Sequence, residues 1–278
     1  MAMLKSGVAL LAFAALAACA TAPDQAASAA KPAAAPAAPN VYAGKSVLDA
    51  AIDAAGGQAA LAQVKELYWT GTATINAGGK TTTVEMMTVV HPQETWARST
   101  SFTKEQGEKG ARTIQVEGNQ GWSVNRVVWD PLPDAQAKNE VGQFALYRMM
   151  LLAPLKKPGA TVAEQPVGAD GTHAIQVKLA DGLGGGELEF DASAKLVRAG
   201  LVVADPKTGA DTPEIVKFSG EMASNGVKWP KHITIEQNGA PFFDLELTSF
   251  EANTAEKPRP LEHTMGGGQE QRRPTSGN

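Results

Sequence analysis

The feature that most constrains the fold is a change of period at Leu67. In residues 67–75, Leu67, Trp69, Gly71, Ala73 and Ile75 alternate with tyrosine and threonine, which is the pattern of a strand with one buried face. Further segments that read as strands follow at 81–91, 94–103, 111–117, 120–128, 161–167, 172–179, 186–191, 195–204, 213–223, 228–238 and 242–252. Their regular spacing favours an antiparallel meander over a sheet built from crossover helices.

Two places break the strand pattern. Residues 134–153 carry Val141, Phe144 and Met149 at helical spacing, and prolines flank the segment on both sides, which predicts a helix. Residues 45–64 predict two short helices, because Ser46 can cap the first and Gly56-Gly57 stops it.

The first 18 residues have the anatomy of a secretory signal. Lys5 precedes an apolar run that is too short to span a membrane. Leu16-Ala17-Ala18-Cys19 resembles a bacterial lipobox, in which the cysteine is lipidated and becomes the mature N-terminus. The alternative is an ordinary cleaved signal with an incidental cysteine. Ala20 stands where an aspartate tends to retain lipoproteins at the inner membrane, so we expect a lipid anchor on the periplasmic side of the outer membrane.

Composition limits the partners and the source of stability. Without residues 1–18, 24 basic residues face 29 acidic ones, so the mature net charge is −5. This mild acidity argues against nucleic-acid binding, which requires clustered lysine and arginine. Cys19 is the single cysteine; no disulfide can form within the chain, and the core must hold the fold alone.

Composition also divides the chain. We expect a signal peptide at 1–18 and, at 19–44, the lipidated cysteine with an alanine- and proline-rich linker that prolines keep from forming a continuous helix. One β domain should occupy 45–254. The glycine- and proline-containing residues 255–278 predict a disordered tail.

Two stretches carry a family resemblance. Ala54-Ala55-Gly56-Gly57, followed by Leu61, Val64 and the strand at 67–75, resembles the start of many periplasmic proteins related to lipoprotein-sorting factors. Residues 226–235, with Asn238-Gly239 and 243–253, resemble the last hairpin of the same group, the LolA/LolB-like superfamily. The group includes the large domain of the stress sensor RseB and mycobacterial lipid-carrier lipoproteins.

The resemblance implies a mainly β (α+β) fold: a single curved antiparallel sheet that forms an incomplete barrel, with helices plugging its concave face. No functional residue of the sorting factors can be matched here. An unclosed barrel leaves an apolar cleft between helix and sheet, the default site for a greasy ligand. The side chains expected to face it are Trp69, Met86, Trp96, Trp122, Phe144, Met149, Ile235 and Phe243. The alternative is that these residues only fill the core.

The residue patterns of catalysis are weak. The four histidines, at 91, 173, 232 and 263, lack zinc-site spacing, so no metal or other cofactor is expected. Ser101 with Lys104, Ser123 with Asn125, and Lys207-Thr208-Gly209 occur in the order used by penicillin-binding serine hydrolases. However, Ser101 ends a predicted strand, where an offset of three residues places Lys104 on the opposite face.

The sequence therefore predicts a non-enzymatic lipoprotein, anchored through Cys19, that binds a lipid or a lipoprotein acyl chain for transfer, sorting or sensing. The alternative is an envelope protein–protein interaction module whose barrel is filled and binds no ligand. A serine hydrolase of the penicillin-binding type is the least favoured reading.

Overall fold

The computed structural model describes residues 40–125 and 128–253. The predicted signal peptide, Cys19, most of the linker and the whole of the predicted tail lie outside these residues. The domain boundaries therefore stay predictions.

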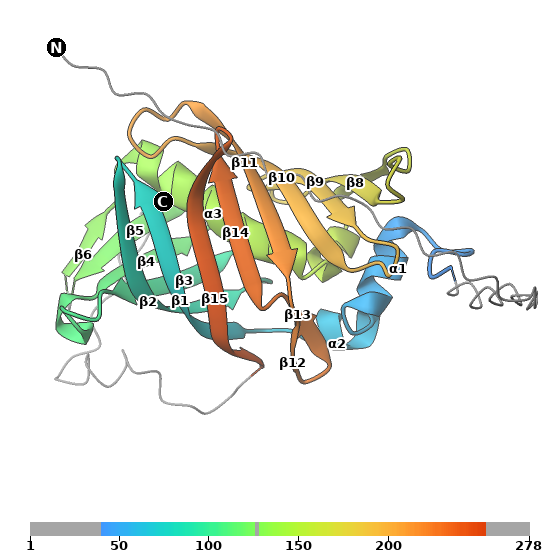
Figure 1. Ribbon diagram of the computed structural model, residues 1–278, viewed down its shortest axis with the longest axis horizontal. Coiled ribbons are helices and arrows are strands. Elements are labelled where there is room, and N and C mark those ends of the chain that lie inside the picture. Colours follow the sequence, from blue (N-terminus) through green and yellow to red (C-terminus); the bar gives the residue numbers. More distant parts are fainter. Residues whose placement is uncertain (1–39, 126–127, 254–278) are drawn as a thin grey trace, which may run out of the picture. The chain divides into compact units, whose positions relative to one another are not determined.

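One large sheet dominates the described part of the chain (Figure 1). Its thirteen strands run in the order β6-β5-β4-β3-β2-β1-β15-β14-β11-β10-β9-β8-β7, and neighbours pair antiparallel throughout. The first half consists of β1 (Leu67–Ala77), β2 (Lys80–His91), β3 (Trp96–Phe102), β4 (Arg112–Glu117), β5 (Gln120–Asn125) and β6 (Val128–Pro131). The second half consists of β7 (Thr161–Glu164), β8 (His173–Lys178), β9 (Gly185–Phe190), β10 (Leu196–Ala204), β11 (Asp211–Ser219), β14 (His232–Gln237) and β15 (Ala240–Ala252).

The sheet is open, and its centre is the pairing of its first and last strands. β1 lies against β15, from Leu67 opposite Ala252 to Ile75 opposite Phe243. The two edges are β6 and β7, which do not pair with each other. The predicted fold class, an incomplete barrel built from one antiparallel sheet, is confirmed.

Three predicted strands each divide in two. The segment at 120–128 forms β5 and β6, which pair with each other. The segment at 213–223 is interrupted at Gly220, whose φ of +65° suits a turn, and continues as β12 (Met222–Ser224). The segment at 228–238 breaks at Pro230, which lacks a backbone N–H for the ladder, into β13 (Val227–Trp229) and β14. β12 and β13 form a separate two-stranded sheet.

The predicted pair of short helices is present as α1 (Val47–Ala54) and α2 (Gln58–Ala62). Ser46 caps α1: its Oγ accepts a hydrogen bond from the Asp49 N–H at 3.1 Å. The corner between the helices docks on β13, where the Lys228 N–H donates to the Ala55 carbonyl at 2.9 Å.

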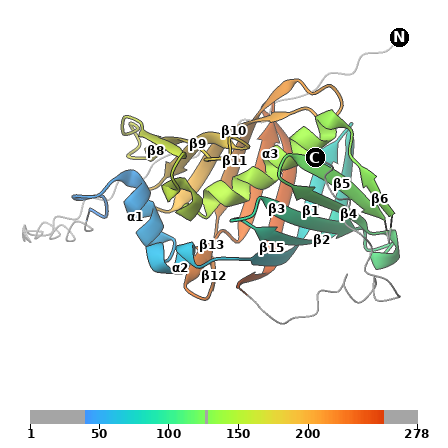
Figure 2. The same ribbon diagram turned by 180° about the vertical axis from the view of Figure 1, so that it is seen from behind.

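The long helix α3 (Asp134–Met150) crosses the concave side of the sheet, in front of it in Figure 2. A short 3₁₀ helix (Ala153–Lys156) follows it, and another (Glu108–Gly110) precedes β4. The apolar core lies between α3 and the sheet, where Trp69, Phe190 and Met149 are almost completely buried.

Two buried polar side chains of α3 hold the helix in place. Asn139 Nδ2 donates to the Ala204 carbonyl at 2.6 Å. Arg148 Nε donates to the Pro92 carbonyl at 3.2 Å, and its Nη2 lies 2.7 Å from the Asp181 carboxylate. Burial opposes ionisation of Asp181, but the hydrogen bonds from Arg148 and Leu183 outweigh it and lower the pKa of that carboxyl. Among the described residues, no helix has the length and apolar character needed to cross a bilayer.

Candidate functional site

A cavity of about 380 Å³ lies between the N-terminal part of α3 and the concave face of the sheet. We call it the α3 cavity. Its lining comprises Ile75, Ala77, Met86, Ser99, Ser101, Arg112, Ile114, Gln136, Asn139, Glu140, Gln143, Phe144, Tyr147, Pro206, Ile235, Phe242 and Phe243. The residues come from six strands (β1, β2, β3, β4, β14 and β15), α3 and the β10–β11 turn, so the cavity exists only in the folded chain.

The sheet side of the cavity is largely apolar. Ile75 and Phe243 are direct partners in the β1–β15 ladder, and Phe243 is also opposite Ile235 of β14. Because partners in an antiparallel ladder point to the same face, these three side chains form one continuous wall. Met86 of β2 and Phe242 of β15 extend this wall.

The cavity carries charge where α3 meets β4. Glu140 of α3 faces Arg112 of β4. Burial raises the pKa of the Glu140 carboxyl, although the nearby Arg112 charge and a hydrogen bond with Gln136 oppose the shift. The site therefore joins an apolar wall to a polar one, which suits a ligand that has both an apolar and a polar part.

A buried carboxyl lies directly behind this polar wall. Glu214 of β11 is 1% exposed, and its Oε1 accepts hydrogen bonds from Gln143 Nε2 and Gln237 Nε2, both at 2.6 Å. Its Oε2 is buried without a hydrogen-bond partner among the described residues. Burial raises the pKa of Glu214 despite the two amide donors. Burial also raises the pKa of Tyr147, and the charges of Glu140 and Glu214 add to that shift.

The structure brings together half of the eight side chains predicted to face the cleft. Met86, Phe144, Ile235 and Phe243 line the α3 cavity. Trp69, Met149 and Trp122 are buried elsewhere, and Trp96 lines a separate cavity of about 10 Å³. That any of the eight binds a ligand stays a prediction.

Sequence reasoning missed the polar half of the site. Glu214 had a readable signal, because its two-residue spacing along β11 places it on the same face as the buried residues Thr212, Val216 and Phe218. Arg112 and Glu140 had none, since their proximity depends on how α3 crosses the sheet.

The residues of the serine-hydrolase pattern do not form its helix-borne pair. Ser101 lies within β3, and the Lys104 ammonium is 3.4 Å from the Glu85 carboxylate. Lys207 and Thr208 sit in a turn whose N–H groups donate to Asp205. Within residues 40–125 and 128–253, no group of three His, Cys, Asp or Glu is placed to hold a metal ion.

Comparison with solved structures finds similar chains of low sequence identity. A putative outer membrane lipoprotein-sorting protein domain from Vibrio parahaemolyticus is 8% identical to this chain. The match covers 78% of this chain and 95% of that one, with a TM-score of 0.48. A LolA superfamily protein from Nitrosomonas europaea is 10% identical, with 74% of this chain and 93% of that one covered and a TM-score of 0.48. A DUF1329 family protein from Desulfovibrio piger is 11% identical, with 77% of this chain and 96% of that one covered and a TM-score of 0.49.

No protein-family model matches the chain, and neither does any curated protein. At these identities and TM-scores, the solved structures carry no conclusion about activity or ligand. The group that the sequence resembles is represented among these similar structures by a LolA superfamily protein and a lipoprotein-sorting protein domain.

Proposed function

We propose that the protein binds a hydrophobic ligand, a lipid or the acyl chain of a lipoprotein, in the α3 cavity. The observation that carries the proposal is the continuous apolar wall formed by Ile75, Phe243 and Ile235 opposite α3. The cavity's volume of about 380 Å³ is within the range of small-molecule sites. This open volume favours ligand binding over the alternative of an interaction module with a filled barrel.

The energetics suit reversible carriage. Each buried methylene contributes about 0.8 kcal/mol, so a partly inserted acyl chain gains several kcal/mol before the cost of its immobilisation. The polar wall around Arg112 and Glu140 gives the polar end of such a ligand hydrogen-bonding partners that a sealed apolar core would lack.

The test uses the full chain with Cys19→Ala, which keeps every cavity residue and removes the proposed acylation site. Native mass spectrometry and organic extraction of the purified protein should reveal a co-purifying lipid, and a fluorescent fatty acid should bind. Ser101→Trp, which projects an indole into the cavity, should abolish both. Thr83→Trp is the matched control, because Thr83 lies opposite Thr74 on the outer face of the sheet. A mass free of ligand and no uptake of the probe would refute the proposal.

We further propose that Cys19 carries the lipid anchor and that the protein resides at the periplasmic side of the outer membrane. Radiolabelled palmitate should be incorporated by the wild type and not by Cys19→Ser. Ala20→Asp should shift the protein to inner-membrane fractions, since aspartate at this position is the retention signal. Equal labelling of Cys19→Ser would contradict the anchor.

A further inference from the structure

We propose that a second cavity, bordered by α1, binds a single-chain fatty acid through two lysines at its mouth. The proposal concerns a different site from the α3 cavity and does not depend on the function proposed for that one. It rests on the shape of the cavity, on the residues of its floor and on the charges at its opening.

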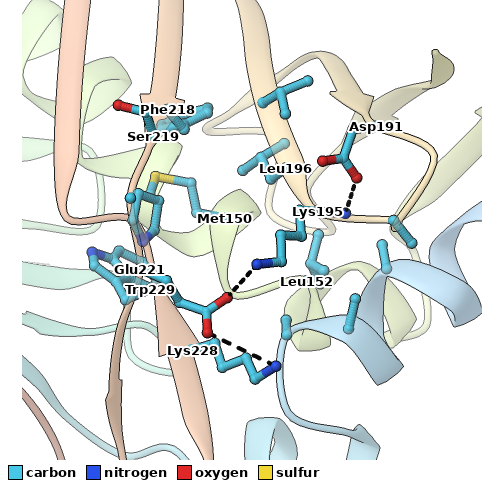
Figure 3. Close-up of a pocket in the computed structure, with 17 residues that line it drawn as sticks. Met150, Leu152, Asp191, Lys195, Leu196, Phe218, Ser219, Glu221, Lys228 and Trp229 are labelled. Atoms are coloured by element: carbon cyan, nitrogen blue, oxygen red, sulfur yellow. Dashed lines mark hydrogen bonds and ion pairs between the residues drawn. The ribbon is translucent and has the colours of Figure 1, made fainter.

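The second cavity, which we call the α1 cavity, has a volume of about 450 Å³ (Figure 3). Its apolar lining includes Met150 at the end of α3, Leu152 just after that helix, Leu196 of β10, Phe218 of β11 and Trp229 of β13. The small side chains Ala51 and Ala54 of α1 form part of its border. Because alanine fills little space, these positions leave room beside the apolar residues.

An aromatic cluster stands between the two cavities. Tyr147 lines the α3 cavity and Trp229 lines the α1 cavity, and their ring centroids are 6.5 Å apart. Trp69 contacts both rings, with centroid distances of 4.7 Å to Tyr147 and 5.8 Å to Trp229. The linings of the two cavities share no residue. We therefore treat them as separate sites that can be altered one at a time.

Two ammonium groups share one carboxylate at the α1 cavity. In Figure 3 the side chains of Lys195 and Lys228 converge on Glu221. Lys195 Nζ lies 3.0 Å and Lys228 Nζ 3.9 Å from the Glu221 carboxylate oxygens. The remaining acidic residue of the lining, Asp191, is engaged differently: its Oδ1 accepts the backbone N–H groups of Ser193 and Lys195 at 2.8 and 3.0 Å. The lysine ammonium groups therefore outnumber the carboxylate they meet.

This arrangement fits one carboxylate of a ligand. The side chains of Lys195, Lys228 and Glu221 are 53%, 45% and 38% exposed, and ion pairs so exposed contribute little to stability. A fatty-acid carboxylate can take the place of the Glu221 carboxylate between the lysines, with charge-assisted hydrogen bonds to both. Its chain would then reach the apolar floor. A cationic head group in the same place would lie beside the two ammonium groups, and the carboxylates of Glu221 and Asp191 would only balance them.

The experiment titrates the full Cys19→Ala chain, carrying Ser101→Trp to block the α3 cavity, by calorimetry below micellar concentrations. Dodecanoate, dodecanol and dodecyltrimethylammonium share a tail and differ in the head group. We expect dodecanoate to bind with 1:1 stoichiometry and at least tenfold more tightly than the cationic probe. The double variant Lys195→Gln/Lys228→Gln should weaken dodecanoate binding roughly tenfold and leave dodecanol binding unchanged.

Glu221→Gln should change the affinity for dodecanoate in the opposite direction. It removes the carboxylate that competes with the ligand for the two lysines, so dodecanoate should bind several-fold more tightly. A role in folding alone would not make the lysine and glutamate variants move in opposite directions. Ala54→Trp, placed in the cavity border, should abolish binding of both dodecanoate and dodecanol. The proposal is overturned if dodecanoate binds the double lysine variant as tightly as the parent, or if Ser101→Trp alone removes all binding. In the second case the α3 cavity remains the binding site.

Discussion

Glu214 is a residue whose surroundings disfavour its charge. Its carboxyl is buried on the concave face of β11, with two amide donors on Oε1 and none on Oε2 among the described residues. Burial raises its pKa above the ordinary glutamate value of 4.5. From about pH 4.5 upward, the folded state therefore holds more protons at this site than the unfolded state, and the free energy of unfolding falls as pH rises.

Glu214→Gln removes this titration while keeping an oxygen that accepts from Gln143 and Gln237. We expect the difference in unfolding free energy, variant minus wild type, to grow in favour of the variant as pH increases above about 4.5, and then to level off above the raised pKa. Urea unfolding at several pH values measures this difference. Glu236→Gln, at an exposed ion pair with Lys217, is the control and should show no comparable slope. A flat difference for Glu214→Gln would mean that its carboxyl is not destabilised by burial.

At the scale of elements, the corner between α1 and α2 depends on two adjacent glycines. Gly56 has a φ of +129°, and a Cβ there would overlap the backbone carbonyl oxygen of Gly226. Gly57 has a φ of +93° but no atom within 4 Å of such a Cβ. The first position therefore combines backbone strain with a close approach of two segments, whereas the second has strain alone.

We expect Gly56→Ala to lower the free energy of unfolding by about 2–4 kcal/mol and Gly57→Ala by only about 1 kcal/mol. The larger effect arises because the corner must separate from the β12–β13 hairpin, losing the hydrogen bond from Lys228 N–H to Ala55 O. Chemical denaturation of both variants measures the two values. Equal losses would show that the close approach contributes nothing.

The anchoring of α3 makes a second prediction at this scale. Arg148 Nε and Nη2 tie the end of the helix to Pro92 and Asp181. Arg148→Met keeps most of the apolar volume and removes the Arg148 donors from both partners, although Asp181 still accepts from the Leu183 N–H and the Thr95 hydroxyl. We therefore expect a loss of about 1–3 kcal/mol. Thermal and urea unfolding should agree on this value. If the variant is as stable as the wild type, the ion pair contributes no more to stability than the apolar contacts of the methionine.

How far the sequence predicts this molecule also depends on the element. The alternation in 67–75 correctly predicts both β1 and its buried face. The reason is local, because residues two positions apart in a strand lie on the same face of the sheet. The breaks at Gly220 and Pro230 were missed, since flanking strand-like residues mask a short turn. The sites are harder: Lys195, Glu221 and Lys228 meet only after the β12–β13 hairpin folds against β10 and α1. Nothing in local spacing reveals that meeting.

At the scale of the whole described unit, the β1–β15 ladder joins two half-sheets that lie far apart in the sequence. Six strands from 67–131 lie on one side of this junction and seven strands from 161–252 on the other. α3 connects the halves in sequence and packs against strands of both, including β5 and β10. Since neither half can cover its concave face without the helix, we expect the halves to unfold together.

The last prediction follows from the packing of α3 against both half-sheets. The chain of residues 40–253 contains every strand of both half-sheets, both walls of the α3 cavity and the lining of the α1 cavity. We expect it to unfold in urea in a single transition, with the same midpoint and slope as the full Cys19→Ala chain, and to bind the same probes. Coincident tryptophan-fluorescence and circular-dichroism curves test cooperativity, because Trp69 and Trp229 lie at the junction while the strands report on the whole sheet. A second transition would show that the half-sheets fold separately. A lower midpoint would show that residues outside 40–253 contribute to stability, which would contradict the assignment of those residues as linker and tail.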